Sequence, residues 1–236
     1  MEKREKIYEG KAKILYGTED PKLLIQSFKD SATALDGKKK GLIEDKGVWN
    51  NKISAKVFEY LESKRIKTHF VKTLSEREML VKRLEMIPLE MVVRNTATGS
   101  ITRRLGIEEG TSFKPPVLEY YLKNDSLGDP MLNRSHIRVL GLAKEEEMKA
   151  LDRLSLKINE VLIPFFLERK IKLVDFKLEF GVMDGKILLG DEISPDTCRF
   201  WDAQSKTIRR LDKDLFRKDL GGEREAYLEV FRRICE

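Results

Sequence analysis

Residues 173–202 have the sequence LVDFKLEFGVMDGKILLGDEISPDTCRFWD, whose alternation places charge on a strand surface that should be buried. Successive side chains of an extended strand point to opposite faces of a sheet. One face then carries three ionic residues, Asp175, Lys177 and Glu179. The other carries the apolar residues between them, Phe176, Leu178 and Phe180. The pattern predicts a strand between a hydrophobic core and a reaction centre.

A β-hairpin is predicted to follow this strand. Asp184-Gly185 supplies turn chemistry, and residues 186–189 return as a second apolar run. If the turn has two residues, Glu179 faces Gly190, and Glu192 rather than Asp191 joins its face. If the loop has three residues, 183–185, Glu179 faces Leu189 instead.

The three-residue loop places Asp191 opposite Lys177 and diagonal to Glu179. We favour this register because it gathers the three charged groups, although the sequence alone leaves the two registers nearly even. Two carboxylates beside a lysine suit Mg²⁺, which takes one or two carboxylates and completes its shell with water and substrate phosphate. The alternative is a solvated antiparallel face with cross-strand ion pairs.

Length and composition favour a soluble globular protein. The 236 residues form one large domain or two small ones with a real core. Cys198 and Cys235 have no metal-ligand spacing and are too few for a disulfide framework, so a reducing cytosol is the default. The N-terminus has no apolar signal region, and no apolar run approaches the roughly 18 residues of a membrane span. We therefore expect a cytoplasmic protein without membrane contact.

The charge balance favours anionic partners. Lysine and arginine number 46 against 40 acidic residues, a net charge of +6. Such a surface attracts nucleic acid or phosphorylated metabolites. The densest basic run, residues 38–40, has no neighbouring aromatic residues, and the other basic residues are spread through the chain. This distribution weakens the nucleic-acid interpretation.

The order of predicted elements indicates an α+β protein of two lobes with a cleft between them. An antiparallel ribbon over residues 6–30 precedes a polar loop, 31–46, and a helix over 48–64. Ile87-Pro88 marks the boundary between a small β-rich N-terminal lobe, residues 1–86, and a larger C-terminal lobe, residues 87–236. In the second lobe we expect helices over residues 144–170 and 222–235, and a proline-rich segment over 113–131 that is irregular apart from residues 119–123.

Three further constellations suit phosphate binding. Lys11 and Lys13 share one strand face just after Gly10, although lysines that protect an edge strand are equally common. RNTATGS, residues 94–100, ends an apolar strand in hydroxyl residues and glycine, which suits an anion cradle or simply a turn with a helix cap. Arg199 offers a planar fork for phosphate or carboxylate.

Five motifs in order resemble the SAICAR synthetase family, the phosphoribosylaminoimidazole-succinocarboxamide synthases. The resemblance covers residues 7–227, nearly the whole chain, and five motifs together are far more specific than any one. They are YEGKAK (8–13), VVRNTATGS (92–100), KNDSLGDP (123–130), LVDFKLEFG (173–181) and LGDEISPDTCRFWD (189–202). The resemblance implies an ATP-dependent ligase of purine biosynthesis that joins carboxyaminoimidazole ribonucleotide to L-aspartate. It also implies a two-lobed fold related to ATP-grasp enzymes, and a homodimer.

The resemblance also implies roles for individual residues. Those that would hold the ATP phosphates are Lys11, Lys13 and Lys123. Those that would bind Mg²⁺ are Glu179 and Asp191. Those that would grip the ribonucleotide are Arg94, Ser100 and Arg199. Those near the reacting end are Lys177, Asp175 and Asp196, and either aspartate would accept the proton of the incoming amine.

The implied reaction suits these residue types. We expect the imidazole carboxylate to attack the γ-phosphoryl group and form an acyl phosphate, which the amine of aspartate displaces. Such a transfer needs alignment and positive charge more than an enzyme nucleophile. Two other classes stay open: a kinase-like small-molecule phosphotransferase, which would not require aspartate, and a basic nucleic-acid-binding protein, whose affinity would depend on salt.

Overall fold

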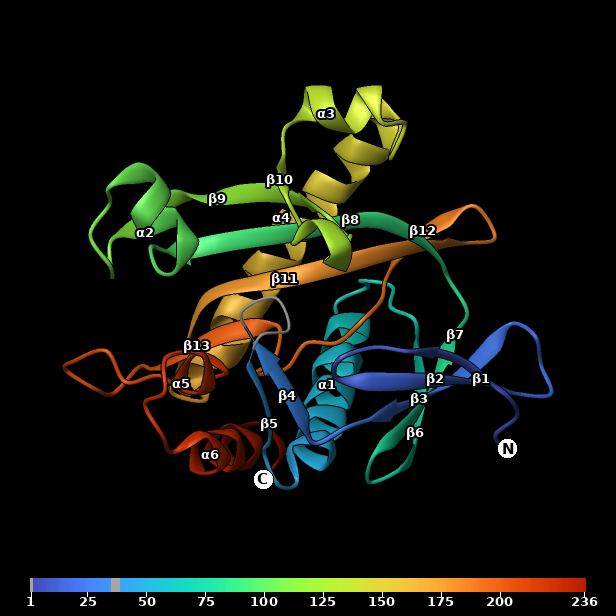
Figure 1. Cartoon of the computed structure of the whole chain (residues 1–236), viewed down its shortest axis with the longest axis horizontal. Coiled ribbons are helices and arrows are strands. Elements are labelled where there is room, and N and C mark those ends of the chain that lie inside the picture. The colour runs from blue at the N-terminus through green and yellow to red at the C-terminus, as the bar shows by residue number, and fades with distance from the viewer. Residues whose placement is uncertain (1, 35–38) are drawn as a thin grey trace.

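The computed structural model describes residues 2–34 and 39–236, which form two large antiparallel sheets, a third sheet of two strands, and helices packed against them (Figure 1). The first sheet has the strand order β1-β2-β3-β7-β6. The second has the order β10-β9-β8-β11-β12, with β13 also paired to β11. The chain is therefore a mixed α/β protein, which confirms the predicted combination of helices and sheets.

The first sheet is built from the N-terminal third of the chain, and the predicted ribbon over residues 6–30 is confirmed. Its strands are β1 (Lys6–Glu9), β2 (Lys13–Gly17), β3 (Leu23–Phe28), β6 (Phe70–Ser75) and β7 (Glu78–Lys82). The predicted loop over residues 31–46 is wrong in part, because β4 (Ser31–Ala34) pairs with β5 (Lys39–Leu42). Within the basic run at residues 38–40, Lys38 lies outside the described residues.

The second sheet contains the three strands of the segment at residues 173–202. Its strands are β8 (Glu85–Thr96), β9 (Ser112–Leu122), β10 (Met131–Leu132), β11 (Ile171–Met183), β12 (Lys186–Leu189) and β13 (Cys198–Asp202). The proline-rich segment over residues 113–131 is predicted to be irregular apart from residues 119–123, and β9 corrects this because the strand begins at Ser112. Its prolines, Pro115 and Pro116, lie in a bulge between Ser112 and Val117, where the register against β8 shifts. Proline is tolerated there because no ladder hydrogen bond requires its missing N–H group.

Two of the helices pack on the large sheets, one on each sheet (Figure 1). They are α1 (Lys46–Ser63), α2 (Ser100–Leu105), η1 (Asp125–Leu127), α3 (Arg134–Val139), α4 (Glu145–Glu168), α5 (Asp214–Arg217) and α6 (Glu223–Cys235). α1 packs on the first sheet and against α6, whereas α4 packs on β8 and β11. The predicted helices over residues 48–64, 144–170 and 222–235 are thus confirmed as α1, α4 and α6.

The apolar face of β11 enters the core as predicted. Phe176, Leu178 and Phe180 are each 1% exposed and belong to the hydrophobic cluster that α4 covers. Burying each of these side chains contributes roughly 1.5–3 kcal/mol to stability. This burial holds the opposite, ionic face of β11 toward the first sheet.

The chain passes from the first sheet to the second between Lys82 and Glu85. Pro88 lies inside β8, where the register against β11 shifts. The predicted boundary between the lobes, at residues 86 and 87, falls within this strand. The division into two lobes stays a prediction. Among the helices in the described part of the chain, none combines the length and apolar character needed to cross a membrane.

Candidate active site

A cavity of about 760 Å³ lies between the two sheets and is lined by residues of both. Apolar side chains form part of its wall. They are Leu15, Leu24, Val81, Leu84 and Met86. Most of the other lining residues are charged, and they include every residue of the predicted site except Ser100. The predicted groups are therefore brought together in one place.

The ionic face of β11 forms one wall of this cavity, as its alternation predicts. Asp175 lies directly opposite Arg94 on β8 and opposite Arg199 on β13. Glu179 lies opposite Glu90 on β8. Because directly opposite residues of antiparallel strands share a face, all five side chains point toward the cavity.

The favoured hairpin register is wrong. Phe180 pairs with Leu189 and Met183 with Lys186, which leaves a two-residue turn at Asp184-Gly185. Both turn residues have positive φ, 49° and 71°, as a type I′ turn requires, and the twist of that turn matches the twist of the strands it joins. The turn geometry therefore overrides the charge clustering on which our choice of register depended.

Asp191 nevertheless lies in the cluster, although the alternation of the strand does not predict this position. The ladder ends where Gly190 N donates to Glu179 O, at 2.9 Å. Asp191 then adopts a φ of 58°, which turns the chain out of the strand direction. Both Asp191 and Glu192 consequently point into the cavity, instead of one of them alone.

Lys177 is the centre of the acidic cluster. Its Nζ lies 2.5 Å from Glu179 Oε1, 2.7 Å from Glu90 Oε1 and 4.0 Å from Asp191 Oδ2. Lys123, from the connection between β9 and β10, donates to the other oxygen of Glu179. Burial would lower the pKa of Lys177, but the carboxylates of Glu179, Asp191 and Glu90 raise it well above its ordinary value.

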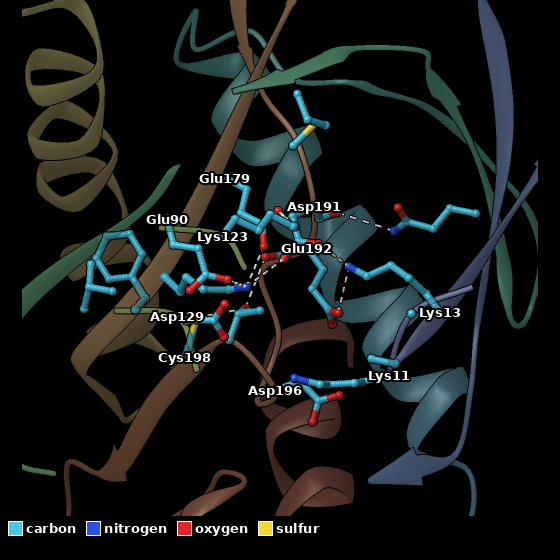
Figure 2. A pocket seen from close by; sticks show the side chains of 18 of the residues that line it. Lys11, Lys13, Glu90, Lys123, Asp129, Glu179, Asp191, Glu192, Asp196 and Cys198 are labelled. Carbon is cyan, nitrogen blue, oxygen red and sulfur yellow. Dashed lines mark hydrogen bonds and ion pairs between the residues drawn. The ribbon is translucent and has the colours of Figure 1, made fainter. Parts of the chain in front are cut away.

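Lys13 enters the same cluster from the first sheet. Figure 2 shows it reaching toward Asp191 Oδ1, at 2.5 Å, and Glu192 Oε1, at 2.9 Å. Burial would raise the pKa of Asp191, but Lys13 and Lys177 hold it well below its usual range. Asp191 therefore stays ionised at neutral pH. Lys11 lies at the exposed edge of the cavity and pairs with Asp125 at 2.7 Å.

Asp175 lies between two guanidinium groups. Its Oδ2 accepts from Arg94 Nη1 at 2.6 Å and from Arg199 Nη1 at 2.9 Å. Arg94 also donates from Nε to Glu119 at 2.8 Å and from Nη2 to Ser100 Oγ at 3.2 Å. Arg94 and Ser100 thus meet as the cradle motif predicts, and buried carboxylates fix the orientation of the guanidinium group.

Asp196 is buried in a network that joins the loop after β12 to α1 and α6. Lys46 Nζ lies 2.5 Å from Oδ2 and Asn50 Nδ2 3.1 Å from the same oxygen, whereas Tyr227 Oη lies 2.7 Å from Oδ1. Burial would raise the pKa of Asp196, but Lys213 and Lys46 hold it well below its usual range. This network suits a positioning role better than proton acceptance, and the catalytic role of Asp196 stays a prediction.

Several residues that line the cavity are absent from the predicted site. They are Glu90, Asp129, Glu192, Lys213 and Arg217. Glu90 has a signal in the sequence, because residues 90, 92 and 94 alternate onto one face of β8. Lys213 and Arg217 lie around the four-residue helix α5, whose segment has no periodic pattern long enough to orient them.

The fold and the cavity define a class of protein. Lysines from both sheets converge on paired carboxylates beside an apolar wall. This arrangement is typical of an enzyme that consumes a nucleoside triphosphate. Comparison with known proteins gives the family. The SAICAR synthetase family model matches residues 6–234.

Relatives match over the full length of the chain. The phosphoribosylaminoimidazole-succinocarboxamide synthase of Coprothermobacter proteolyticus is 58% identical over 99% of both chains. The crystal structure of the synthase from Ehrlichia chaffeensis superposes with a TM-score of 0.94, at 48% identity and 98% coverage of both chains. A SAICAR synthetase in complex with ADP gives a TM-score of 0.93, at 49% identity and 97% coverage of both. The chain belongs to the SAICAR synthetase family.

Membership makes the chain an ATP-dependent carbon–nitrogen ligase of purine biosynthesis, as the five motifs predict. The kinase-like and nucleic-acid-binding alternatives are not favoured.

Proposed function

We propose that this cavity binds ATP through Lys11, Lys13 and Lys123 and condenses carboxyaminoimidazole ribonucleotide with L-aspartate there. The products are the succinocarboxamide ribonucleotide, ADP and phosphate. The observation that carries the proposal is the convergence of Lys13, from one sheet, and Lys123, from the other, on the carboxylates of Asp191 and Glu179. A relative solved with ADP supports the use of this nucleotide, and the apolar wall suits its base.

Glu179 and Asp191 fit a magnesium site. Both line the cavity, and a lysine ammonium group pairs with each of the two carboxylates. Within residues 2–34 and 39–236 no group of three or more potential ligands is found. Two carboxylates are nevertheless sufficient for Mg²⁺, because substrate phosphate and water complete its octahedral shell. When bound, the ion would neutralise charge on the transferring phosphoryl group.

The ribonucleotide is assigned to the end of the cavity with Arg94, Ser100 and Arg199. The two guanidinium groups meet at Asp175, which holds them in fixed orientations for phosphate or carboxylate. Lys177 lies between this end and the proposed ATP phosphates, so its ammonium group is placed to offset charge during transfer.

The chemistry proceeds in two displacements. An oxygen of the imidazole carboxylate attacks the γ-phosphorus, the bond to the β–γ bridging oxygen breaks, and ADP leaves. The amine of aspartate then attacks the acyl carbon, the bond to the phosphate breaks, and the amine loses a proton. Asp175 stays our candidate for the acceptor of that proton, whereas we assign Asp196 a positioning role because its low pKa makes it a weak base.

At a larger scale we propose the two lobes expected from the sequence, residues 1–86 and 87–236, related to the ATP-grasp arrangement. The change of sheet between β7 and β8 supports this division. We also propose a homodimer and a cytoplasmic location. Light scattering of the purified protein tests the dimer, and a monomeric mass at working concentration would exclude it.

The reaction is tested with ATP, Mg²⁺ and the ribonucleotide, with and without L-aspartate. We expect ADP and the succinocarboxamide product in equal amounts, and no sustained ADP release when aspartate is left out. Steady ADP release without aspartate would instead indicate the phosphotransferase. Lys13→Met is expected to abolish turnover, whereas Lys52→Met, which removes an exposed lysine paired with Glu76, serves as the matched control.

A further inference from the structure

Glu109 lies outside the lining of the cavity, in the loop between α2 and β9. Backbone hydrogen bonds hold this loop beside the cradle motif at residues 94–100. Ala97 N donates to Thr111 O at 2.7 Å, and Gly110 N donates to Ala97 O at 2.9 Å. The loop that carries Glu109 is therefore fixed directly behind the residues that we assign to the ribonucleotide.

One contact of the Glu109 carboxylate is with the cradle motif itself. Thr98 is fully buried, and its Oγ1 donates to Glu109 Oε1 at 2.5 Å. The next residue, Gly99, approaches the Arg199 guanidinium group so closely that a Cβ atom there would be in contact with it. The hydrogen bond from Thr98 therefore fixes the backbone against which Arg199 lies.

A second contact of the same carboxylate oxygen is with the segment beside β13. Arg210 Nη2 donates to Glu109 Oε1 at 2.8 Å. The Arg210 side chain is 13% exposed, and within the described residues Glu109 is its one ionic partner. Arg210 pairs with Trp201 of β13, the strand that also carries Arg199. Glu109 thus joins the cradle motif to the neighbour of the strand that carries the second substrate-binding arginine.

Removal of this carboxylate would leave both partners without an acceptor. A buried hydroxyl without an acceptor and a buried guanidinium group without a counter-ion are both unfavourable, so each segment would rearrange. Lys218 Nζ lies 3.6 Å from the same oxygen, but an ammonium group is a donor and cannot replace the acceptor. Since Arg94 belongs to one segment and Arg199 lies beside the other, their relative placement would change.

The adjacent residue, Glu108, gives a natural contrast. Glu108 is exposed, and within the described residues its side chain has no hydrogen bond or ion pair. Burial would raise the pKa of Glu109, but the hydrogen bonds from Thr98 and Arg210 lower it below its ordinary value. Two neighbouring glutamates of one loop therefore differ in whether the fold uses their charge.

We infer that Glu109 is a positioning residue for the ribonucleotide, because its carboxylate fixes the cradle motif relative to the segment beside β13 and so sets the arrangement of Arg94 and Arg199. The inference rests on the proposed placement of the ribonucleotide at Arg94, Ser100 and Arg199. Glu109 itself does not touch the substrate in this account.

The test compares Glu109→Ala and Glu109→Gln with the native enzyme. Alanine removes the acceptor, whereas glutamine keeps an acceptor for Thr98 and loses the charge that pairs with Arg210. We expect the ribonucleotide KM to rise about fivefold to fiftyfold in Glu109→Ala, below the roughly 150-fold of one complete charge-assisted hydrogen bond, and to rise less in Glu109→Gln. The KM for ATP should stay within about twofold. Glu108→Ala is the matched control and should keep native constants.

A double-mutant cycle with Thr98→Val provides a readout that a general structural role would not move. Valine resembles threonine in shape and lacks the hydroxyl donor. If Glu109 acts through Thr98, the double variant should raise the ribonucleotide KM by less than the product of the two single effects. Thr98→Ser keeps the hydroxyl and should keep a nearly native KM. Glu109 is partly exposed, so its variants should fold, and urea unfolding checks this.

Three results would overturn the inference while leaving the ligase function intact. The first is an unchanged ribonucleotide KM in folded Glu109→Ala. The second is an equal rise in the KM values of all three substrates, and the third is a double variant whose effect equals the product of the single effects. Failure of the native enzyme to make product from all three substrates would instead contradict the proposed function.

Discussion

Gly99→Ala tests how closely the backbone of the cradle motif approaches Arg199. Gly99 has φ 68° and ψ −130° at the start of α2, a conformation that is open to glycine and strained for residues with a Cβ atom. An added Cβ would lie 2.8 Å from Arg199 Nη2 and 3.1 Å from Cζ. Since the backbone cannot easily retreat, we expect the guanidinium group to move.

The expected magnitude has two parts. The strained backbone costs of order 1–3 kcal/mol of stability. Displacing the guanidinium group removes up to one charge-assisted hydrogen bond to the ribonucleotide, about 1.5–3 kcal/mol, or roughly 10- to 150-fold in apparent affinity. The ion pairs of Arg199 with Asp175 and Asp214 resist the displacement, which favours the lower end of this range.

The assay measures the ribonucleotide KM together with urea unfolding, and Gly106→Ala is the matched control. Gly106 ends the same helix at φ 64° and ψ 25°, and a Cβ there would meet nothing within 4 Å. Alanine in this left-handed conformation costs about 1–2 kcal/mol of stability. Gly106 is not part of the cavity lining. Equal ribonucleotide KM values in the two variants would refute the proposed contact between this backbone and the substrate-binding arginine.

Three further predictions follow from the buried charges. Glu179→Gln and Asp191→Asn should each lose turnover while unfolding remains cooperative, and near-normal activity at saturating Mg²⁺ would contradict their assignment. Tyr227→Phe removes the 2.7 Å hydrogen bond to Asp196 and should cost about 1–3 kcal/mol in urea unfolding; no measurable loss would mean that this bond contributes nothing. Burial, and then Asp214, raise the pKa of Asp212 to about 7, so the folded state keeps a proton that the unfolded state releases above about pH 4. The resulting stability is present below about pH 4 and is lost as the pH rises through about 7. Relative to Asp212→Asn, the native chain should therefore lose unfolding free energy across that window, and parallel pH profiles would exclude this.

The alternation along β11 made one wall of the site predictable from the sequence. Side-chain direction in a strand depends only on the backbone period, so Asp175, Lys177 and Glu179 could be placed on one face without any tertiary information. Their cross-strand neighbours followed the same rule, and Glu90 could have been found in this way from its spacing to Arg94.

The hairpin register was not predictable in the same way. It depends on the twist of a two-residue turn with two positive φ angles, and Asp-Gly is compatible with both loop lengths that we considered. Asp191 reaches the cluster through its own positive φ after the ladder ends. No residue alternation encodes that bend.

Contacts between distant segments were beyond sequence reasoning altogether. Lys46 and Asp196 are 150 positions apart, and each has an ordinary local context. The buried network around Asp196 could therefore not be told from a free catalytic carboxylate. The same holds for Lys213, because its burial and its one ionic contact, with Asp196, exist only in the folded chain.

A crystal structure with a non-hydrolysable ATP analogue, Mg²⁺ and carboxyaminoimidazole ribonucleotide would show where the substrates and the ion bind. We expect the triphosphate between Lys13 and Lys123, the ion bound by Glu179 and Asp191, and the ribonucleotide against Arg94 and Arg199. A metal ion that touches neither carboxylate, or a nucleotide bound outside the cavity between the two sheets, would contradict the account.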